Sequence, residues 1–418
     1  MTLEATIAGL TKESKKAARV VANLATTAKN QALLAMAEAL VRRKTYIQAE
    51  NEKDLAAGRD QGLSAAMLDR LALSDKVISA MVDGLREVAA LPDPVGEIAE
   101  MQRRPSGIMV GRMRIPLGVI GMIYESRPNV TVDAAALCLK AGNAVILRGG
   151  SEALRSNLAL VQVLRDCLAA EKIDSAAIQV IPVSDRAAVT CMLQREEEID
   201  LIIPRGGEGL IRFVAENSRI PVLKHYKGVC HVFVDAGADP EMAMRIALNG
   251  KTQRPGVCNA LEALLVHRDS AAKLLPALGD RLAAAGVEVR GCPQTLALIP
   301  SGKPAVAEDW GMEFLDLILA VKVVADITEA MAHIAQYGSQ HTEVIITNNH
   351  SHAQRFLREV DASSVMVNAS TRFSDGGQYG LGAEIGISTT KLHAYGPMGL
   401  RALTTRKFVV YGEGQIRE

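Results

Sequence analysis

The chain has 418 residues, of which 49% are hydrophobic and 22% are charged. This is the balance of a globular protein with a large core, so a disordered chain and a small disulfide-stapled fold are excluded. Lys and Arg number 47, as do Asp and Glu, so the formal net charge is zero. A neutral chain has no overall attraction for nucleic acid or anionic lipid, and an anionic ligand must be held by local cations. Aromatic residues make up only 3%, which disfavours stacking platforms for single-stranded nucleic acid.

The N-terminus and the cysteines bear on the compartment. The opening residues, MTLEATIAGLTKESKK, lack the basic segment and apolar run of a secretory signal. No stretch approaches 18 uninterrupted apolar residues, so we expect no membrane span. The cysteines form no CxxC pair and no zinc-like spacing with histidine, so we expect no metal site and reduced thiols in a cytoplasm. The six cysteines are Cys138, Cys167, Cys191, Cys230, Cys258 and Cys292.

Residues 1–90 are predicted to be helical, because good helix formers dominate and apolar residues recur at helical spacing. A segment with proline and glycine at 91–96 ends this pattern, and residues 112–115 alternate as in a short strand. From residue 118 on, apolar runs alternate with helical segments, which predicts βαβ units and a parallel sheet. We expect strands at 118–124, 144–147, 178–181 and 201–203, helices at 131–141, 152–170, 186–193 and 210–217, and an extended segment at 221–223.

A second α/β series begins near residue 232, so the predicted fold class is α/β with two open sheets. After residue 370 the chain is rich in Gly, Ser and Thr until a final apolar run at 406–411. We expect the strands of the second series at 232–235, 263–266, 287–289, 321–324, 342–347 and 364–367, and its helices at 241–248, 271–285, 328–336 and 350–360.

Two Gly-Gly turns, in residues 148–152 and 204–209, come where a strand should meet a helix. Neither GxxxxGK[ST] nor GxGxxG occurs, so a P-loop and the common dinucleotide fingerprint are unsupported. In a parallel sheet these turns fall at the carboxyl edge, where helix N-termini offer N–H groups to phosphate. Arg148 would add a charge-assisted contact. The alternative is that each pair only makes a tight connection; the pattern favours a cofactor role.

Cys258 follows a Pro-Gly turn and precedes a segment, 259–262, that looks helical. A thiol in the first turn of a helix is stabilised as a thiolate by the helix dipole, and Lys251 and Arg254 would act in the same direction. Such a thiolate is a nucleophile beside an anion-binding site. The alternative is a buried structural cysteine, which is the commoner fate. The local sequence favours reactivity.

Asn129 lies just beyond the strand at 118–124. An amide there can donate to a developing oxyanion, or it can cap the helix that follows. The residues alone favour the cap. His333 and His341 could each face a ligand, but a structural histidine is the favoured interpretation.

These features resemble the aldehyde dehydrogenase superfamily over nearly the whole chain. Residues 116–121 resemble its opening strand, and residues 140–152 its cofactor strand, turn and helix, with Arg148 where most relatives carry lysine. Asn129 and Cys258 match the oxyanion-hole asparagine and the nucleophile. Glu313, with residues 320–324, resembles the segment whose glutamate holds the nicotinamide ribose.

Two segments resemble one branch of that superfamily, the gamma-glutamyl phosphate reductases. They are KTQRPGVCNALE at 251–262 and AHIAQYGSQHTE at 332–343. Oxidising members of the superfamily carry a water-activating glutamate in a Glu-Leu-Gly-Gly-Lys context. The corresponding residues 223–228, LKHYKG, contain no carboxylate. An enzyme that reduces a thioester must not hydrolyse it, so this difference suits the reductive branch.

The resemblance implies an NADPH-dependent reduction of L-glutamyl 5-phosphate to L-glutamate 5-semialdehyde and phosphate, through a cysteine thioester, in proline biosynthesis. Cys258 would be the nucleophile and Asn129 an oxyanion donor. Arg127, Lys251 and Arg254 would hold the substrate, although each could instead form a structural ion pair. The implied cofactor-binding residues are Arg148, Gly149, Gly150, Ser151, Glu152, Gly206, Gly207, Glu208 and Glu313.

The resemblance also implies three parts of the chain. Residues 1–228 would form an NADP-binding domain, with 110–117 in an oligomerisation arm; 229–369 a catalytic domain; and 370–418 a return crossover and a C-terminal oligomerisation strand. The partners would be the small-molecule substrate, further copies of the chain and the upstream glutamate kinase, with no nucleic acid, membrane or metal. Two alternatives stay open: another acyl reductase or semialdehyde dehydrogenase of this fold, and a non-catalytic nucleotide-binding scaffold.

Overall fold

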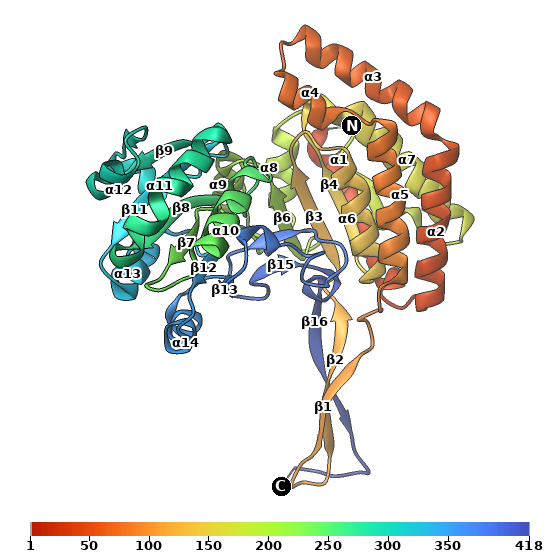
Figure 1. Ribbon diagram of the computed structural model, residues 1–418. Coiled ribbons are helices and arrows are strands. Elements are labelled where there is room, and N and C mark those ends of the chain that lie inside the picture. The colour runs from red at the N-terminus through yellow and green to blue at the C-terminus, as the bar shows by residue number, and fades with distance from the viewer. Residues whose placement is uncertain (1, 418) are drawn as a thin grey trace. The chain divides into compact units, whose positions relative to one another are not determined.

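The computed structural model describes residues 2–417, which form two compact units (Figure 1). The first unit comprises the chain up to Lys224 together with Gly380–Gly386 and the segment from Met398 on. The second comprises His225–Tyr379 and Ile387–Pro397. The predicted third part, 370–418, is thus divided between the two units. Each unit is described by itself.

Residues 3–90 form five helices joined by short connections, in agreement with the helical prediction. Serine side chains begin two of these helices, because Ser64 and Ser74 accept the backbone N–H groups of Met67 and Val77. The helices are α1 (Leu3–Val21), α2 (Thr26–Arg42), α3 (Lys44–Asp60), α4 (Ala65–Leu71) and α5 (Asp75–Ala90).

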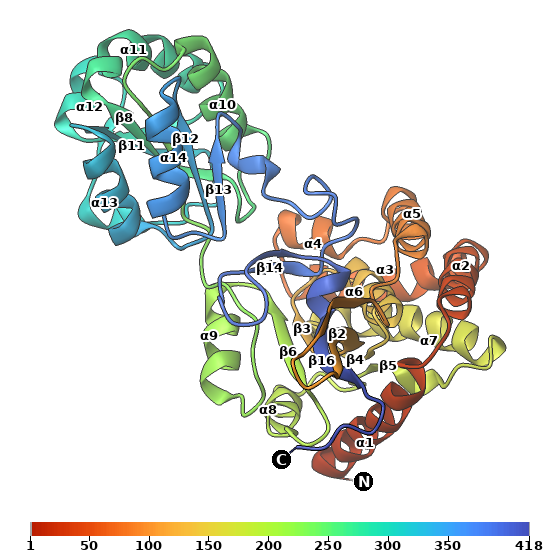
Figure 2. The same ribbon diagram turned by 90° about the horizontal axis from the view of Figure 1, so that it is seen from below.

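A parallel sheet with strand order β5-β4-β3-β6 forms the core of the first unit. Apolar side chains of α1 and α8 pack together on strand residues such as Val119 and Ile202. Helices α6 and α7 also contact the sheet (Figure 2). Gly142, with φ +78°, ends α6 where the sequence predicted. The elements are β3 (Val119–Tyr124), α6 (Asn129–Lys140), β4 (Ala144–Arg148), η1 (Ser151–Ala153), α7 (Leu154–Ala170), η2 (Ser175–Ala177), β5 (Ile178–Val180), α8 (Ala187–Leu193), β6 (Leu201–Arg205) and α9 (Glu208–Asn217).

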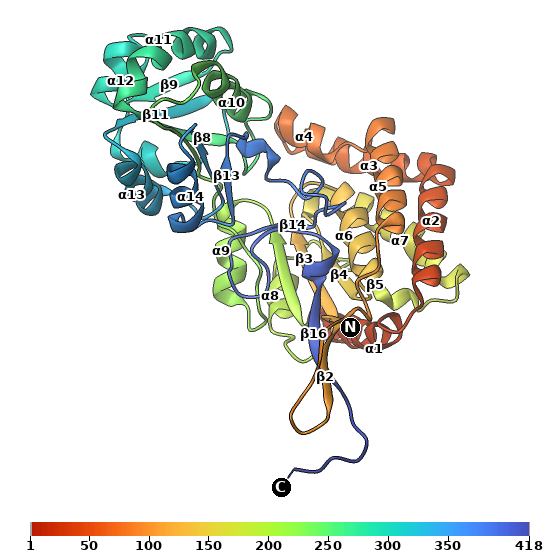
Figure 3. The same cartoon turned by 60° about the horizontal axis from the view of Figure 1, so that its bottom comes forward.

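A three-stranded antiparallel arm extends from the first unit (Figures 1 and 3). It contains β1 (Ile98–Arg103), β2 (Met109–Pro116) and β16 (Thr404–Tyr411), in the order β1-β2-β16. The predicted strands at 112–115 and 406–411 pair within it, since β16 lies along β2 from Thr404 opposite Pro116 to Tyr411 opposite Met109. β1 was not predicted. The short helix η5 (Leu400–Leu403) precedes β16.

The second unit is built on a seven-stranded sheet with the order β10-β9-β11-β8-β7-β12-β13, whose paired strands are all parallel. One core lies between the sheet and helices α10 to α12, and a second lies beneath α13 and α14. The strands are β7 (Cys230–Val234), β8 (Leu261–His267), β9 (Glu288–Gly291), β10 (Lys303–Pro304), β11 (Ile318–Val324), β12 (Thr342–Ile346) and β13 (Ser364–Val367). The helices are α10 (Pro240–Thr252), α11 (Arg268–Ala284), α12 (Pro293–Leu298), η3 (Ala307–Gly311), α13 (Ile327–Tyr337), α14 (His350–Glu359) and η4 (Thr371–Phe373).

The short strands β14 (Gly386–Ser388) and β15 (Gly396–Met398) complete the elements described. Among residues 2–417, no helix is both long enough and apolar enough to cross a membrane.

Candidate functional site

Cys258 lies in a turn that joins the end of α10 to the start of β8, and its side chain is half-buried. The helix predicted at 259–262 is wrong, because β8 begins at Leu261 and all seven of its residues are buried between β7 and β11. The apolar run that follows the turn forms a strand of the sheet instead. Cys258 therefore does not begin a helix, and the predicted help from a helix dipole is absent.

The start of β7 supports the turn that carries Cys258. The Cys230 thiol donates to the carbonyl oxygen of Cys258 over 3.2 Å. A Cβ atom added to Gly228 would lie only 2.0 Å from that same oxygen, so only glycine allows the two backbones to approach this closely. Neither residue stands out in the sequence, where Cys230 is only one of six cysteines.

Lys251, predicted to contact the substrate, is fully buried and forms an ion pair of 2.7 Å with Glu262, which is also fully buried. Burial lowers the pKa of Lys251, and the neighbouring carboxylate of Glu262 opposes that effect. Burial likewise raises the pKa of Glu262 to about 7. The ammonium group is thus committed to a structural ion pair, the alternative that the sequence left open.

Two arginines accompany Cys258 in the second unit. Arg254, a predicted substrate residue, is exposed on the same turn. Arg372, which the sequence analysis did not single out, lies in η4, and its Nε donates to the side chain of Gln253 over 2.7 Å. The only signal that could have found Arg372 is a single cation in an otherwise uncharged stretch, residues 362–374.

The segment with Glu313 precedes β11 and reaches the same region of the second unit. The backbone N–H of Leu315 donates to Oε1 of Glu262 over 3.3 Å, and Glu313 itself is half-buried. A Cβ atom on Gly256 would lie 3.7 Å from the carbonyl of Leu315, which places this segment beside the turn of Cys258.

In the first unit, Asn129 is the first residue of α6 rather than its cap. Pro128 occupies the cap position without a side-chain hydrogen bond, so the cap interpretation is wrong. The Nδ2 of Asn129 instead donates to Asp133 over 3.2 Å. Burial raises the pKa of Asp133 from its ordinary 3.8 to about 6. The predicted substrate residue Arg127 lies two positions earlier, between β3 and α6.

Arg148 ends β4 and is only 8% exposed. Its guanidinium donates to the carbonyl of Gly149 and, over 3.1 Å, to that of Ser184. Burial lowers the pKa of Arg148, and Glu152 opposes this. One carboxylate oxygen of Glu152 accepts the hydroxyl of Ser126, which connects this turn to the end of β3.

Internal carboxylates already occupy N–H groups at both helix starts that were expected to meet phosphate. Asp54 accepts the backbone N–H of Ser156 in α7 over 2.8 Å. Glu125 accepts the N–H of Gly207, at the start of α9, over 3.1 Å. Carboxylates at the carboxyl edge of a parallel sheet are suited to ribose hydroxyls more than to phosphate.

Two observations indicate that Arg148 and the turn at 206–209 can hold a dinucleotide. The Nε of Arg148 is buried without a hydrogen-bond partner among the described residues. A Cβ atom on Gly207 or Gly209 would meet nothing within 4 Å, so the backbone there can be approached from outside.

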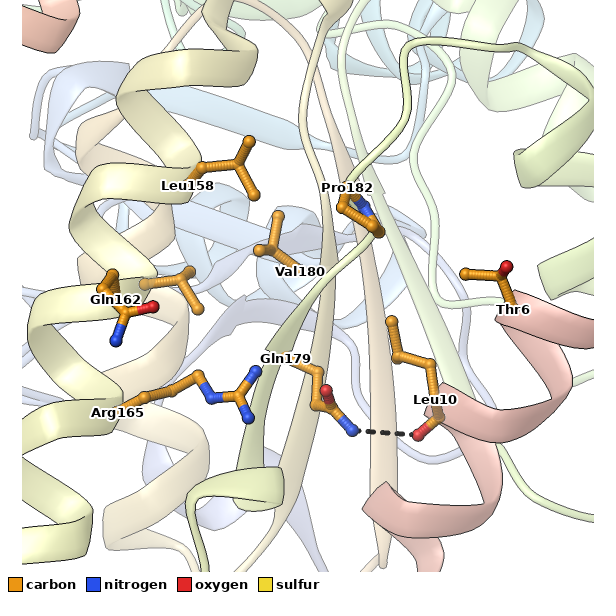
Figure 4. Close-up of a pocket in the computed structure, with 9 residues that line it drawn as sticks. Thr6, Leu10, Leu158, Gln162, Arg165, Gln179, Val180 and Pro182 are labelled. Carbon is orange, nitrogen blue, oxygen red and sulfur yellow. Dashed lines mark hydrogen bonds between the residues drawn. The ribbon is translucent and has the colours of Figure 1, made fainter. Parts of the chain in front are cut away.

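A pocket of about 300 Å³ lies away from these residues, at the edge strand β5 between α1 and α7 (Figure 4). The side chain of Gln179 donates to the carbonyl of Leu10 across it, and no predicted site residue lines it. No group of three or more His, Cys, Asp or Glu side chains in the described part of the chain is placed to hold a metal ion.

The fold and these residues define the class of the protein. A family model described as "Aldehyde dehydrogenase family" matches residues 3–295, and the chain belongs to that family. Within it, the chain groups with proteins named gamma-glutamyl phosphate reductase. The relatives from Desulfotalea psychrophila and Geotalea daltonii with that name are each 62% identical to this chain, over 100% of both chains in each pair.

Solved structures agree. A crystal structure of gamma-glutamyl phosphate reductase from Thermotoga maritima is similar with a TM-score of 0.97 and 48% identity, over 99% of this chain and 100% of that one. An acetylating aldehyde dehydrogenase from Geobacillus thermoglucosidasius has a TM-score of 0.70 at 16% identity, over 100% of this chain and 98% of that one. The second likeness concerns the fold alone. The predicted family and fold class are confirmed.

Proposed function

We propose that this chain reduces L-glutamyl 5-phosphate to L-glutamate 5-semialdehyde and phosphate with NADPH, as a step of proline biosynthesis in the cytoplasm. The observation that carries the proposal is a half-buried cysteine on a supported turn beside two arginines, in a chain 62% identical to proteins named for this reaction. An acyl phosphate carries a good leaving group, which a free carboxylate lacks.

The chain's own residues perform the acyl transfer. The Cys258 thiolate forms a bond to the acyl carbon, and the C–O bond to phosphate then breaks, leaving a thioester on Cys258. The backbone N–H of Cys258 is one proposed donor to the oxyanion, and the resemblance to the family gives Asn129 the role of a second donor. Each donor contributes ~3 kcal/mol in comparable sites. When bound, NADPH supplies the hydride. Collapse of the second oxyanion returns the Cys258 thiolate and releases the aldehyde.

Retention of the thioester against water follows from residues 223–228. This segment, Leu-Lys-His-Tyr-Lys-Gly, holds no carboxylate that could activate water, and its last residue, Gly228, packs against the backbone of Cys258. An enzyme of a branch that lacks this base keeps its thioester intact until hydride is transferred.

The cofactor would be held by Arg148, Gly149, Gly150, Ser151, Glu152, Gly206, Gly207, Glu208 and Glu313. Arg148 favours the 2′-phosphate of NADPH, whereas Glu152 suits a free 2′-hydroxyl, as in NADH. We keep NADPH as the proposed cofactor. The ratio of kcat/KM for the two cofactors tests this, and a ratio that favours NADH would contradict it.

The arm would join copies of the chain. β16 is an edge strand whose Phe408 and Val410 are 66% and 56% exposed, and the Arg112 guanidinium lies 4.4 Å from the Phe408 ring centroid. An edge strand with unpaired backbone groups and exposed apolar side chains is a template for strand pairing, here with a second copy. Light scattering should show an oligomer that Phe408→Asp dissociates; a wild-type monomer would contradict this. Association with the kinase that makes the unstable acyl phosphate stays a prediction.

One assay tests the function. NADPH oxidation is measured with enzymatically generated glutamyl phosphate, and the reverse reaction with semialdehyde, phosphate and NADP⁺. Cys258→Ser should abolish both, and Asn129→Ala should lower kcat by ~10² or more. Turnover with acyl-CoA but not acyl phosphate would favour a different acyl reductase. Cofactor binding without any turnover would favour a non-catalytic scaffold.

A further inference from the structure

We propose that Arg372 and Arg254 form a binding site for the phosphoryl group of the acyl phosphate, next to the nucleophile. This inference rests on the proposed function and specifies how the substrate's leaving group is held. Arg372 replaces Lys251 as a proposed substrate contact, because the ammonium of Lys251 is buried against Glu262.

Hydrogen bonds on both sides of Cys258 fix η4 against the turn. Before the nucleophile, the side chain of Gln253 accepts the Nε–H of Arg372 over 2.7 Å. After it, the Asn259 amide donates to the carbonyl of Ser374 over 2.8 Å. A Cβ atom on Gly250 would lie 3.5 Å from Oγ1 of Thr371, so η4 also packs on the last turn of α10. The segment that carries Arg372 therefore runs alongside the one that carries Arg254 and Cys258.

The positive charges of Arg254 and Arg372 are available to a ligand. Within residues 2–417, neither Arg254 nor Arg372 forms an ion pair, and the Nη groups of Arg372 make no hydrogen bond. The neighbouring carboxylate of Asp375 accepts the N–H groups of Gly377 and Gln378 through Oδ1 instead. Burial and the charge of Arg254 lower the pKa of Arg372, while Cys258 and Asp375 oppose this. Two arginines whose charges act on each other, and neither of which forms an ion pair with a carboxylate, favour a bound anion.

The chemistry of the substrate selects the phosphoryl group as that anion. The phosphoryl oxygen is bonded to the carbon that Cys258 attacks, whereas the α-carboxylate lies at the far end of the glutamyl chain. Arg254 on the turn of the nucleophile and Arg372 in η4 are therefore expected at the phosphoryl end of the substrate rather than at the α-carboxylate. Guanidinium groups match phosphate oxygens in a fork geometry, and they offset the repulsion between a thiolate and an anionic acyl donor.

In the reverse reaction, phosphate and semialdehyde are added as two compounds. The binding of the phosphoryl end and of the glutamyl end can therefore be measured independently. Arg372→Gln should raise the KM for inorganic phosphate roughly 10-fold to 100-fold, the loss expected for a hydrogen bond to a charged group. The KM for semialdehyde should change by less than about 2-fold, because sites that share no contacts affect each other only weakly. Arg372→Lys should restore part of the phosphate affinity, because it keeps the charge but loses the fork.

The controls keep the test decisive. Arg254→Gln should repeat the phosphate effect, which covers the case in which Arg372→Gln does not fold. Arg358→Gln, at an exposed arginine of α14, should leave both KM values unchanged. An unchanged KM for phosphate in both Arg372→Gln and Arg254→Gln, or a raised KM for semialdehyde alone, would overturn the inference. A wild-type chain without phosphate-dependent turnover would instead overturn the proposed function.

Discussion

The thiol of Cys230 is a hydrogen-bond donor to the carbonyl oxygen of Cys258, over 3.2 Å. Burial raises the pKa of Cys230 well above its ordinary value, so this side chain keeps its proton and with it the donor. The thiol of Cys230 thus supports the backbone of Cys258, the proposed nucleophile.

Loss of this donor should slow the reaction without weakening substrate binding. Cys230→Ala leaves the Cys258 carbonyl without its partner, and we expect kcat to fall about 5-fold, since a hydrogen bond of this kind contributes about 1 kcal/mol. The KM values should stay near wild type. Cys230→Ser keeps a donor and should recover most of kcat. Equal kcat in Cys230→Ala and wild type would show that the thiol has no positioning role.

A methyl group at Gly228 should damage the site more severely. In Gly228→Ala the new Cβ would overlap the carbonyl of Cys258, so the turn must move. We expect kcat to fall by ~10², because a displacement of about 1 Å near the nucleophile has that effect. Gly9→Ala, on α1 where nothing lies within 4 Å of a new Cβ, is the matched control. Steady-state kinetics of both variants decide, and wild-type kcat in Gly228→Ala would contradict the packing described.

The buried ion pair between Lys251 and Glu262 should be needed for the stability of the folded chain. Lys251→Met leaves the Glu262 carboxylate buried without its partner, and we expect a loss of about 3–5 kcal/mol in the free energy of unfolding. The double variant Lys251→Met/Glu262→Gln should recover much of this loss. Urea unfolding followed by circular dichroism measures both. A stable Lys251→Met variant with a raised substrate KM would show instead that Lys251 contacts the substrate.

Asp133 should make stability depend on pH. Its pKa is raised in the folded state from 3.8 to about 6, so the folded chain binds the proton more tightly than the unfolded chain. The resulting stability is fully present below pH ~4 and is lost as the pH rises through about 6, a change of about 1–3 kcal/mol. Relative to wild type, Asp133→Asn should therefore gain stability between pH 4 and pH 7. A constant difference across this range would contradict the raised pKa.

Much of the fold was predictable because its pattern is local. The apolar runs at 118–124 and 144–147 and the stop at Gly142 are visible in the sequence, and the structure has β3, β4 and the end of α6 there. The segment after Cys258 was mispredicted, because residues 259–262 contain good helix formers. Only the pairing of β8 with β7 and β11 makes Leu261 and Glu262 the start of a strand.

A sequence motif points to Cys258, whose role stays a prediction, whereas partners that are distant in the sequence could not be predicted. The pairing of Lys251 with Glu262 and the contact of Arg372 with Gln253 depend on the fold, and no spacing reveals them. The same holds for Glu125 and Asp54, whose carboxylates take N–H groups of helices far along the chain.

The most direct test of the account is to look for the acyl group on Cys258. The wild-type protein is mixed with enzymatically generated glutamyl phosphate without NADPH, quenched in acid, and examined by intact-mass and peptide mass spectrometry. We predict one glutamyl group on Cys258, absent in Cys258→Ser and lost within one turnover once NADPH is added. A wild-type protein that turns over but never carries the group, or carries it on another residue, would contradict the covalent mechanism.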